Sequence, residues 1–214
     1  PCLFVQGACG DLGPRVQRHS QMQWAECTRL GQEVGEAVLA LVHSTQPVVS
    51  TPLMHRSQQV LLPLESPDEY EASHHIWGVL ARALYASDWL VDPLLERLFP
   101  WNQELVETAL GVAAAMRVHC MRLGEILLVT LGAELFTEIG LSIKATSPAA
   151  HTLVAGVTNG CVGYLPTAEE HALGGYEVDI APRFYRVPSR FAAHAAEQTI
   201  AEVSEMVREM YGII

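Results

Sequence analysis

Long apolar segments are missing from this sequence, and so are clusters of basic residues. No apolar run approaches the ~18–20 residues that a membrane-spanning helix needs, so no transmembrane segment is expected. Lysine and arginine together number 13 against 24 acidic residues, which gives a formal charge of −11. Because binding to a phosphate backbone needs clustered Lys and Arg, nucleic acid is excluded as the main partner.

Cysteine and histidine patterns typical of metal sites are absent as well. The 5 cysteines are odd in number and form no C-x-x-C motif, which argues against a disulfide framework or a zinc knuckle. Buried free thiols are expected instead. The histidines show no H-x-x-x-H spacing. A surface or hydrogen-bonded role is therefore expected for His55, the His74–His75 pair and His171, of which His171 is the best placed for a ligand.

Hydrophobic residues make up 50% of the chain, which is enough for a domain with a sizeable core. Apolar periodicity predicts helices over residues 22–43, 134–145 and 189–210, and interrupted helical segments over 67–115. Strands are expected at 2–5, 60–62, 117–122, 125–131 and 151–157, with a hairpin at Gly124. This mixture predicts an α/β class (mixed α+β layers) and a single unit over residues 1–214.

A glycine-rich loop follows the first expected strand, with glycines at Gly7, Gly10 and Gly13 and an acid at Asp11. The spacing is G-x-x-G-x-x-G without Lys, Ser or Thr, which differs from both common phosphate-binding motifs. Glycines that allow close backbone approach or positive φ are the better physical explanation. Asp11 is expected to accept hydrogen bonds from backbone amides in the turn.

Three polar residues stand out in the second half of the chain. Glu134 lies where an apolar strand ends and a helix begins, and a carboxylate buried there is costly unless it is paired or bound to metal. A helix N-terminal acid favoured by the dipole is the alternative. Tyr164 and Tyr176 each follow a glycine in an irregular segment, and a packed aromatic role is open for both.

The segments FVQGACGDLGP, LGAELFTEIGL and TNGCVGYLPTAEEHALGGYE resemble, in the same order, motifs of the neutral, non-lysosomal ceramidases and their bacterial homologues. The resemblance is to the C-terminal half of the family's catalytic domain and leaves a divergent middle. It implies a zinc-dependent hydrolase that cleaves an amide, or alternatively an ester, in a small-molecule or lipid substrate. Zinc would be bound by Glu134 and Tyr164, and Tyr176 would contact the reacting amide.

The chain departs from the family pattern at two places. The active-site loop of the family carries a serine where this sequence has Gly13, within the stretch that begins at Gly10 and Asp11. The two zinc histidines of the family lie upstream of that loop, so the resemblance implies a missing N-terminal segment or partner chain that supplies them. The 214 residues would then be the C-terminal part of a larger catalytic domain. Many family members are exported, which leaves the compartment of this protein open.

Two other functions stay open from the residues. The first is a non-catalytic binding or structural protein that keeps the family fold, with Gly13 as the sign of lost chemistry. The second is a hydrolase with a cysteine nucleophile, for which Cys9 in the glycine loop is the candidate. Zinc binding without turnover would favour the first, and loss of activity on thiol alkylation with zinc retained would favour the second.

Overall fold

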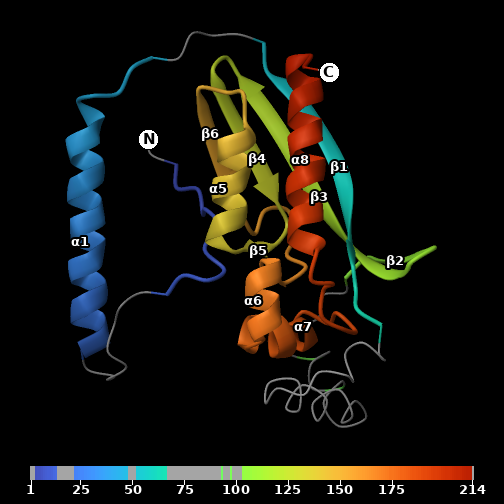
Figure 1. Ribbon diagram of the computed structural model, residues 1–214. Helices are drawn as coiled ribbons and strands as arrows, with labels where there is room; N and C mark the ends of the chain where they lie inside the picture. Colours follow the sequence, from blue (N-terminus) through green and yellow to red (C-terminus); the bar gives the residue numbers. More distant parts are fainter. Residues whose placement is uncertain are drawn as a thin grey trace. The chain divides into compact units, whose positions relative to one another are not determined.

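The computed structural model describes residues 3–13, 22–47, 52–66, 93, 97 and 103–213 (Figure 1). Contacts within the chain divide it into two compact units. One unit is Gly13–Thr51, and the other combines Pro1–Leu12 with Pro52–Ile214. The single unit expected over residues 1–214 stays a prediction.

The smaller unit contains one long helix, α1 (Met22–Val42), which matches the helix predicted over residues 22–43. On its surface Arg29 forms ion pairs with Glu26 and Glu33, one turn away on either side. Such exposed pairs add only a few tenths of a kcal/mol each, about 0.3–0.5. None of the helices in the described ranges has the length and apolar character needed to cross a membrane.

The larger unit is built on a five-stranded sheet with the order β1-β3-β4-β6, in which β2 also pairs with β3. Its strands are β1 (Met54–Pro63), β2 (Leu105–Thr108), β3 (Gly111–Leu123), β4 (Ile126–Leu131) and β6 (His151–Ala155). Strand β3 is antiparallel to β1, β2 and β4, whereas β4 and β6 run parallel. The predicted hairpin at Gly124 is confirmed, and its φ of 61° suits glycine.

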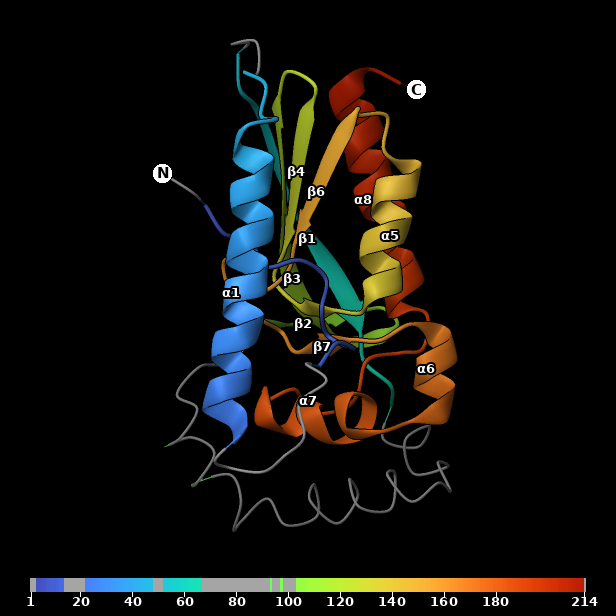
Figure 2. The same ribbon diagram turned by 90° about the vertical axis from the view of Figure 1, so that its left-hand side faces the viewer.

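The remaining elements follow β4 along the chain. They are β5 (Glu134–Leu135), α5 (Thr137–Thr146), β7 (Tyr164–Leu165), α6 (Ala168–Leu173), the π-helix η1 (Tyr176–Ile180), α7 (Ala181–Phe184) and α8 (Ala195–Tyr211). Helices α5 and α8 cover one face of the sheet, which Figure 2 shows nearly edge-on. The predicted class, mixed α/β, is confirmed.

The core lies between the sheet and helices α5 and α8. Alternate residues of β3 and β4 point into it, as the two-residue period of a strand requires. These are Ala114, Met116, Val118 and Cys120 from β3, and Leu127, Val129 and Leu131 from β4. Burial raises the pKa of the Cys120 thiol to about 12, so this cysteine is an inert core residue. The four cysteines in the described ranges are free thiols, but the prediction that they are buried holds only for Cys120, since Cys27 is exposed and Cys9 and Cys161 are partly exposed.

Four predictions of secondary structure are wrong. Glu134 and Leu135 were expected to begin a helix but form β5, and α5 begins at Thr137. Residues 3–5 form no strand, and within the described part of the chain no neighbouring strand pairs with them. Residues 105–108 and 111–115 were expected to be helical but form β2 and the start of β3, because pairing on both sides of β3 outweighs the helix propensity of its alanines. The last helix begins at Ala195 instead of 189. Residues 67–92 lie outside the described ranges.

Candidate functional site

Strands β5 and β7 form a separate two-stranded parallel sheet in the segment after β4, close to α6 and α7 (Figure 1). Within this small sheet Glu134 and Tyr164 are direct cross-strand partners. The Glu134 amide donates to the Gly163 carbonyl at 2.9 Å. Because directly opposite residues in adjacent strands project to the same side, their side chains are neighbours. The fold therefore joins two of the three predicted site residues from motifs that are distant in sequence.

Three tyrosines surround the Glu134 carboxylate. The ring centroid of Tyr164 lies 6.1 Å from that of Tyr176 and 6.0 Å from that of Tyr185, both in edge-on geometry. The Tyr185 hydroxyl donates a hydrogen bond to Glu134 Oε1. Tyr185 was missed by the sequence analysis, because it follows the last recognised motif and carries no local signal. Edge-to-face aromatic pairs of this kind contribute about 0.5–1.5 kcal/mol beyond their burial.

The phenols are held in their protonated form. Burial, and after it the nearby Glu134 carboxylate, raises the pKa of Tyr164 and of Tyr176 above the usual range. Burial and the hydrogen bond to Glu134 raise the pKa of Tyr185 in the same direction. Each hydroxyl is consequently a hydrogen-bond donor at neutral pH. The exposed fraction of Tyr176, 43%, leaves this residue accessible to a small molecule.

The donor set matches a metal shell only in part. Glu134 and Tyr164 bring a carboxylate and a phenol oxygen to one place, and oxygen donors of this kind are acceptable to zinc. A structural or catalytic zinc site has about four ligands, at least three of them from protein. Within the ranges that the structure describes, no group of three or more His, Cys, Asp or Glu side chains is gathered around a common point.

The glycine loop packs directly on the segment that carries Glu134. The Gly10 amide donates to the Leu135 carbonyl at 2.7 Å, and a Cβ at Gly10 would lie 2.6 Å from the Glu134 carbonyl oxygen. Close approach is thus the reason for glycine at this position. Asp11 Oδ1 accepts hydrogen bonds from the amide and hydroxyl of Thr137, both at 2.8 Å. Asp11 therefore caps α5 and accepts from a distant amide instead of one in its own turn.

Gly13 belongs to the smaller unit. A Cβ at Gly13 would meet no atom of the described residues within 4 Å. The two glycines of the loop are consequently under different constraints, because Gly10 has no room for a side chain and Gly13 does.

We expect Gly10→Ala to lower the free energy of unfolding by about 1–3 kcal/mol, the usual cost of overpacking. The added Cβ has to displace the Glu134 backbone, which cannot move without breaking its β5–β7 pairing. Urea titration measures the loss, and Gly13→Ala is the matched control because its Cβ meets open space. Equal stability of the two variants would show that the loop does not pack on Glu134.

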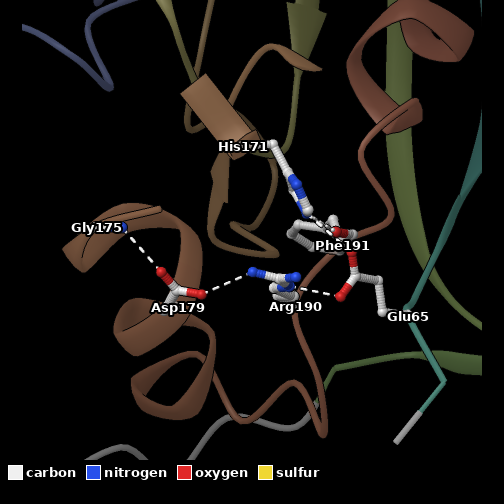
Figure 3. Close-up of polar contacts among 6 residues, drawn as sticks. All are labelled: Glu65, His171, Gly175, Asp179, Arg190 and Phe191. Carbon is white, nitrogen blue, oxygen red and sulfur yellow. Dashed lines mark hydrogen bonds and ion pairs between the residues drawn. The ribbon is translucent and has the colours of Figure 1, made fainter. Parts of the chain in front are cut away.

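Two of the histidines considered as metal ligands, His171 and His55, lie within the described ranges, and the side chain of each contacts other polar groups of the protein. His171 is 7% exposed. Its Nε2 lies 2.9 Å from the Phe191 carbonyl and 3.2 Å from Glu65 Oε1 (Figure 3). Both neighbours are acceptors, so Nε2 carries a proton and cannot bind a metal. His55 Nε2 lies 3.3 Å from His119 Nδ1 on the sheet. His74 and His75 fall outside the described residues.

Cys9, the candidate thiol nucleophile, lies in the loop with its Sγ 2.9 Å from the Gln6 side-chain amide. An amide is not a general base, so this contact does not activate the thiol. Next to Gly10 the thiol is only partly exposed. The geometry therefore gives no support to the cysteine hydrolase.

A cavity of about 340 Å³ opens next to Glu177 and Val178 of η1. It is lined by Asp11, Phe136, Glu170, Gly174, Glu177 and Val178. These residues come from the loop, from the β5–α5 junction, from α6 and from η1. Its volume is at the low end of the range for small-molecule sites, ~300–1,000 Å³. Three carboxyl groups in the lining make the cavity unfavourable for an anionic ligand.

The buried Glu65 predicts an acid-sensitive stability. Its side chain is 12% exposed. Burial alone would raise its pKa, but hydrogen bonds from His171 and Arg190 outweigh burial and lower the pKa below about 4.5 in the folded protein. A carboxyl with a lowered pKa contributes stability above its unfolded pKa and loses it as pH falls through the folded value. We expect Glu65→Gln to flatten the fall of unfolding free energy as the pH drops below about 4.5, measured by urea titration at each pH. An unchanged slope would contradict this.

Comparisons with known proteins give weak likenesses. No family model matches the chain, and no curated protein matches it. A solved ceramidase complexed with C2 is similar over 46% of this chain and 15% of its own, with 19% identity and a TM-score of 0.38. A neutral ceramidase from Pseudomonas aeruginosa is similar over 76% of this chain, with 14% identity and a TM-score of 0.44. The match spans 29% of the Pseudomonas chain. At these scores neither likeness assigns a function to this protein.

Proposed function

We propose that this chain forms part of the active site of a zinc-dependent hydrolase of the neutral ceramidase type, which cleaves an amide or, as the second option, an ester. The observation that carries the proposal is the direct pairing of Glu134 with Tyr164, with Tyr176 packed edge-on against Tyr164. Glu134 comes from one motif of the family resemblance, and Tyr164 and Tyr176 come from another. Their convergence is what a common site requires.

Glu134 and Tyr164 would bind the zinc ion, and two further ligands would come from a segment outside the described residues. The family resemblance assigns those two ligands to histidines that precede the glycine loop. Bound zinc would supply an activated water with a pKa of about 7 and a polarised substrate carbonyl. Tyr185 holds one oxygen of Glu134 through its hydroxyl, which fixes the orientation of the carboxylate.

Tyr176 is the residue of this chain that would touch the substrate. Burial raises its pKa and keeps the proton on the phenol, and its partial exposure leaves the residue accessible to a ligand. A neutral phenol can donate a hydrogen bond to a carbonyl oxygen as that oxygen gains negative charge. Tyr176 would therefore stabilise the oxyanion of the tetrahedral intermediate.

The substrate would be a small-molecule or lipid amide, and the part of it that enters the cavity next to η1 would carry no negative charge. The carboxyl groups of Asp11, Glu170 and Glu177 in the cavity wall disfavour an anion there. A panel of N-acyl amines and matched esters, offered to the zinc-loaded complete gene product, tests this. Turnover of neutral or amine-bearing amides in preference to acyl amino acids is expected. Faster turnover of the acidic substrates would overturn the charge argument.

The alternative is a binding or structural protein that keeps this geometry without turnover. Gly13, at the position of the family's active-site serine, is the feature that favours it. Zinc bound at about one ion per chain with no turnover across the whole panel would establish this alternative. Absence of bound zinc after reconstitution with zinc would exclude a zinc site from both the hydrolase and the binding-protein alternative.

A further inference from the structure

Four ionisable side chains form a buried cluster below the site, and we refer to Glu65, His171, Asp179 and Arg190 as the buried ion network (Figure 3). Asp179 is 0% exposed and Arg190 is 8% exposed. The four residues come from the segment after β1, from α6, from η1 and from the segment before α8. Ion pairs and hydrogen bonds among these side chains thus connect segments that are distant in sequence.

The network contacts are well defined. Arg190 Nη1 donates to Asp179 Oδ1 at 2.8 Å, and Arg190 Nε donates to Glu65 Oε2. The second oxygen of Glu65 receives His171 Nε2 at 3.2 Å. The second oxygen of Asp179 accepts from the Gly175 amide at 2.8 Å. Each carboxylate therefore uses both oxygens, and each joins two different parts of the chain.

The buried ion network contacts Gly175, the residue that precedes Tyr176, through Asp179. Gly175 has φ 139° and ψ −170°, a conformation open in practice only to glycine. Asp179 holds this glycine from both sides, because its carboxylate accepts from the Gly175 amide while its own amide donates to the Gly175 carbonyl at 2.9 Å. Such a backbone conformation persists only where the surroundings fix it.

The other flank of the turn is fixed through His171. Gly174 caps α6, and its amide donates to the His171 carbonyl at 3.3 Å. The His171 ring is in turn held by Glu65 and the Phe191 carbonyl. The Gly174–Gly175 turn is therefore held from α6 on one side and from η1 on the other.

Stability alone does not explain such a cluster. Replacing buried ion pairs by well-packed apolar residues is often neutral or stabilising, because the desolvation cost of the charges is recovered only in part. What charged partners add over apolar packing is a defined geometry. The geometry defined here is that of the turn that carries Tyr176.

We propose that Asp179 and Arg190 are positioning residues that fix the Tyr176 phenol next to Tyr164 and Glu134. The catalytic consequence rests on the proposed function, whereas the position of the phenol can be measured without it. In Asp179→Asn one acceptor oxygen is replaced by an amide that donates, so either the Gly175 amide or Arg190 loses its partner. In Arg190→Met both carboxylates lose the guanidinium.

The test places 3-fluorotyrosine at position 176 of the full chain and records its ¹⁹F resonance. Asp179→Asn and Arg190→Met should shift or broaden the signal. Val203→Ala, a core change in α8, is the matched control: it should lower the melting temperature and leave the signal in place. Glu65→Gln, which keeps the shape of the side chain, serves as the milder variant if the others do not fold.

Turnover of the amide substrate separates this proposal from the proposed function. Asp179→Asn should lower kcat by about 10- to 100-fold with bound zinc unchanged, since a misplacement of about 1 Å has that effect. A displaced resonance in a protein without any turnover would leave the positioning role intact and sink the proposed function. An unmoved resonance in destabilised network variants, or an equal movement in Val203→Ala, would show that the network acts on stability alone.

Discussion

Glu134→Gln in the complete gene product should lose its bound zinc while it remains folded. Glutamine has the size of glutamate and can still accept the hydrogen bond from Tyr185, so the β5–β7 pairing and the phenol cluster should persist. The neutral amide oxygen, however, is a poor substitute for a carboxylate ligand. Changes in the residues that merely support a ligand weaken metal binding by about 10- to 100-fold, and removal of the ligand itself should exceed that.

Competition with a chromogenic chelator measures the zinc affinity of this variant, and a thermal melt measures its folding. Glu138→Gln is the matched control, because Glu138 lies four positions further on, in the first turn of α5, with an exposed side chain. It changes the net charge by the same amount and should bind zinc like the wild type. Zinc at wild-type affinity in folded Glu134→Gln would sink the assignment of this residue as a ligand.

Tyr176→Phe should lower kcat by about 10²- to 10³-fold, the usual effect of removing one oxyanion donor. The ring stays, so the edge-on contact with Tyr164 should be retained, and zinc content should not change. A loss confined to kcat identifies a contact made in the transition state, whereas a rise in KM alone would identify ground-state binding. Steady-state kinetics of the zinc-loaded complete protein with its best amide substrate separates the two.

Tyr211→Phe provides the control for that measurement. Tyr211 lies on α8, and its ring packs under Arg122 with 4.0 Å from the guanidinium carbon to the ring centroid. Its hydroxyl is buried and makes no hydrogen bond within the described part of the structure. Removing that oxygen should leave turnover unchanged. Wild-type turnover in Tyr176→Phe would exclude the phenol from the reaction and return Tyr176 to a packing role.

The candidate site was predictable to the extent that it rests on local motifs. Glu134 stands out because a carboxylate follows an apolar strand, and Tyr164 and Tyr176 because each follows a glycine in an irregular segment. Their proximity was implied by the family resemblance and by no local pattern, since it depends on the register of two short strands. Tyr185 and Arg190 had no motif at all. Their roles come from partners that lie far away in the sequence, namely Glu134 and Glu65.

The sequence by itself determined what short-range physics controls. Helical periodicity predicted α1, and the apolar runs around Gly124 predicted the hairpin of β3 and β4. Only the tertiary structure decided the secondary structure of the alanine-rich residues 111–115, which form a strand because they pair with β1 and β2. It also decided that His171 is a buried hydrogen-bond donor and that Asp179 holds the turn before Tyr176. Strand pairing and buried ion networks join segments that are distant in sequence. Their interaction energies depend on residues that a local sequence pattern does not identify.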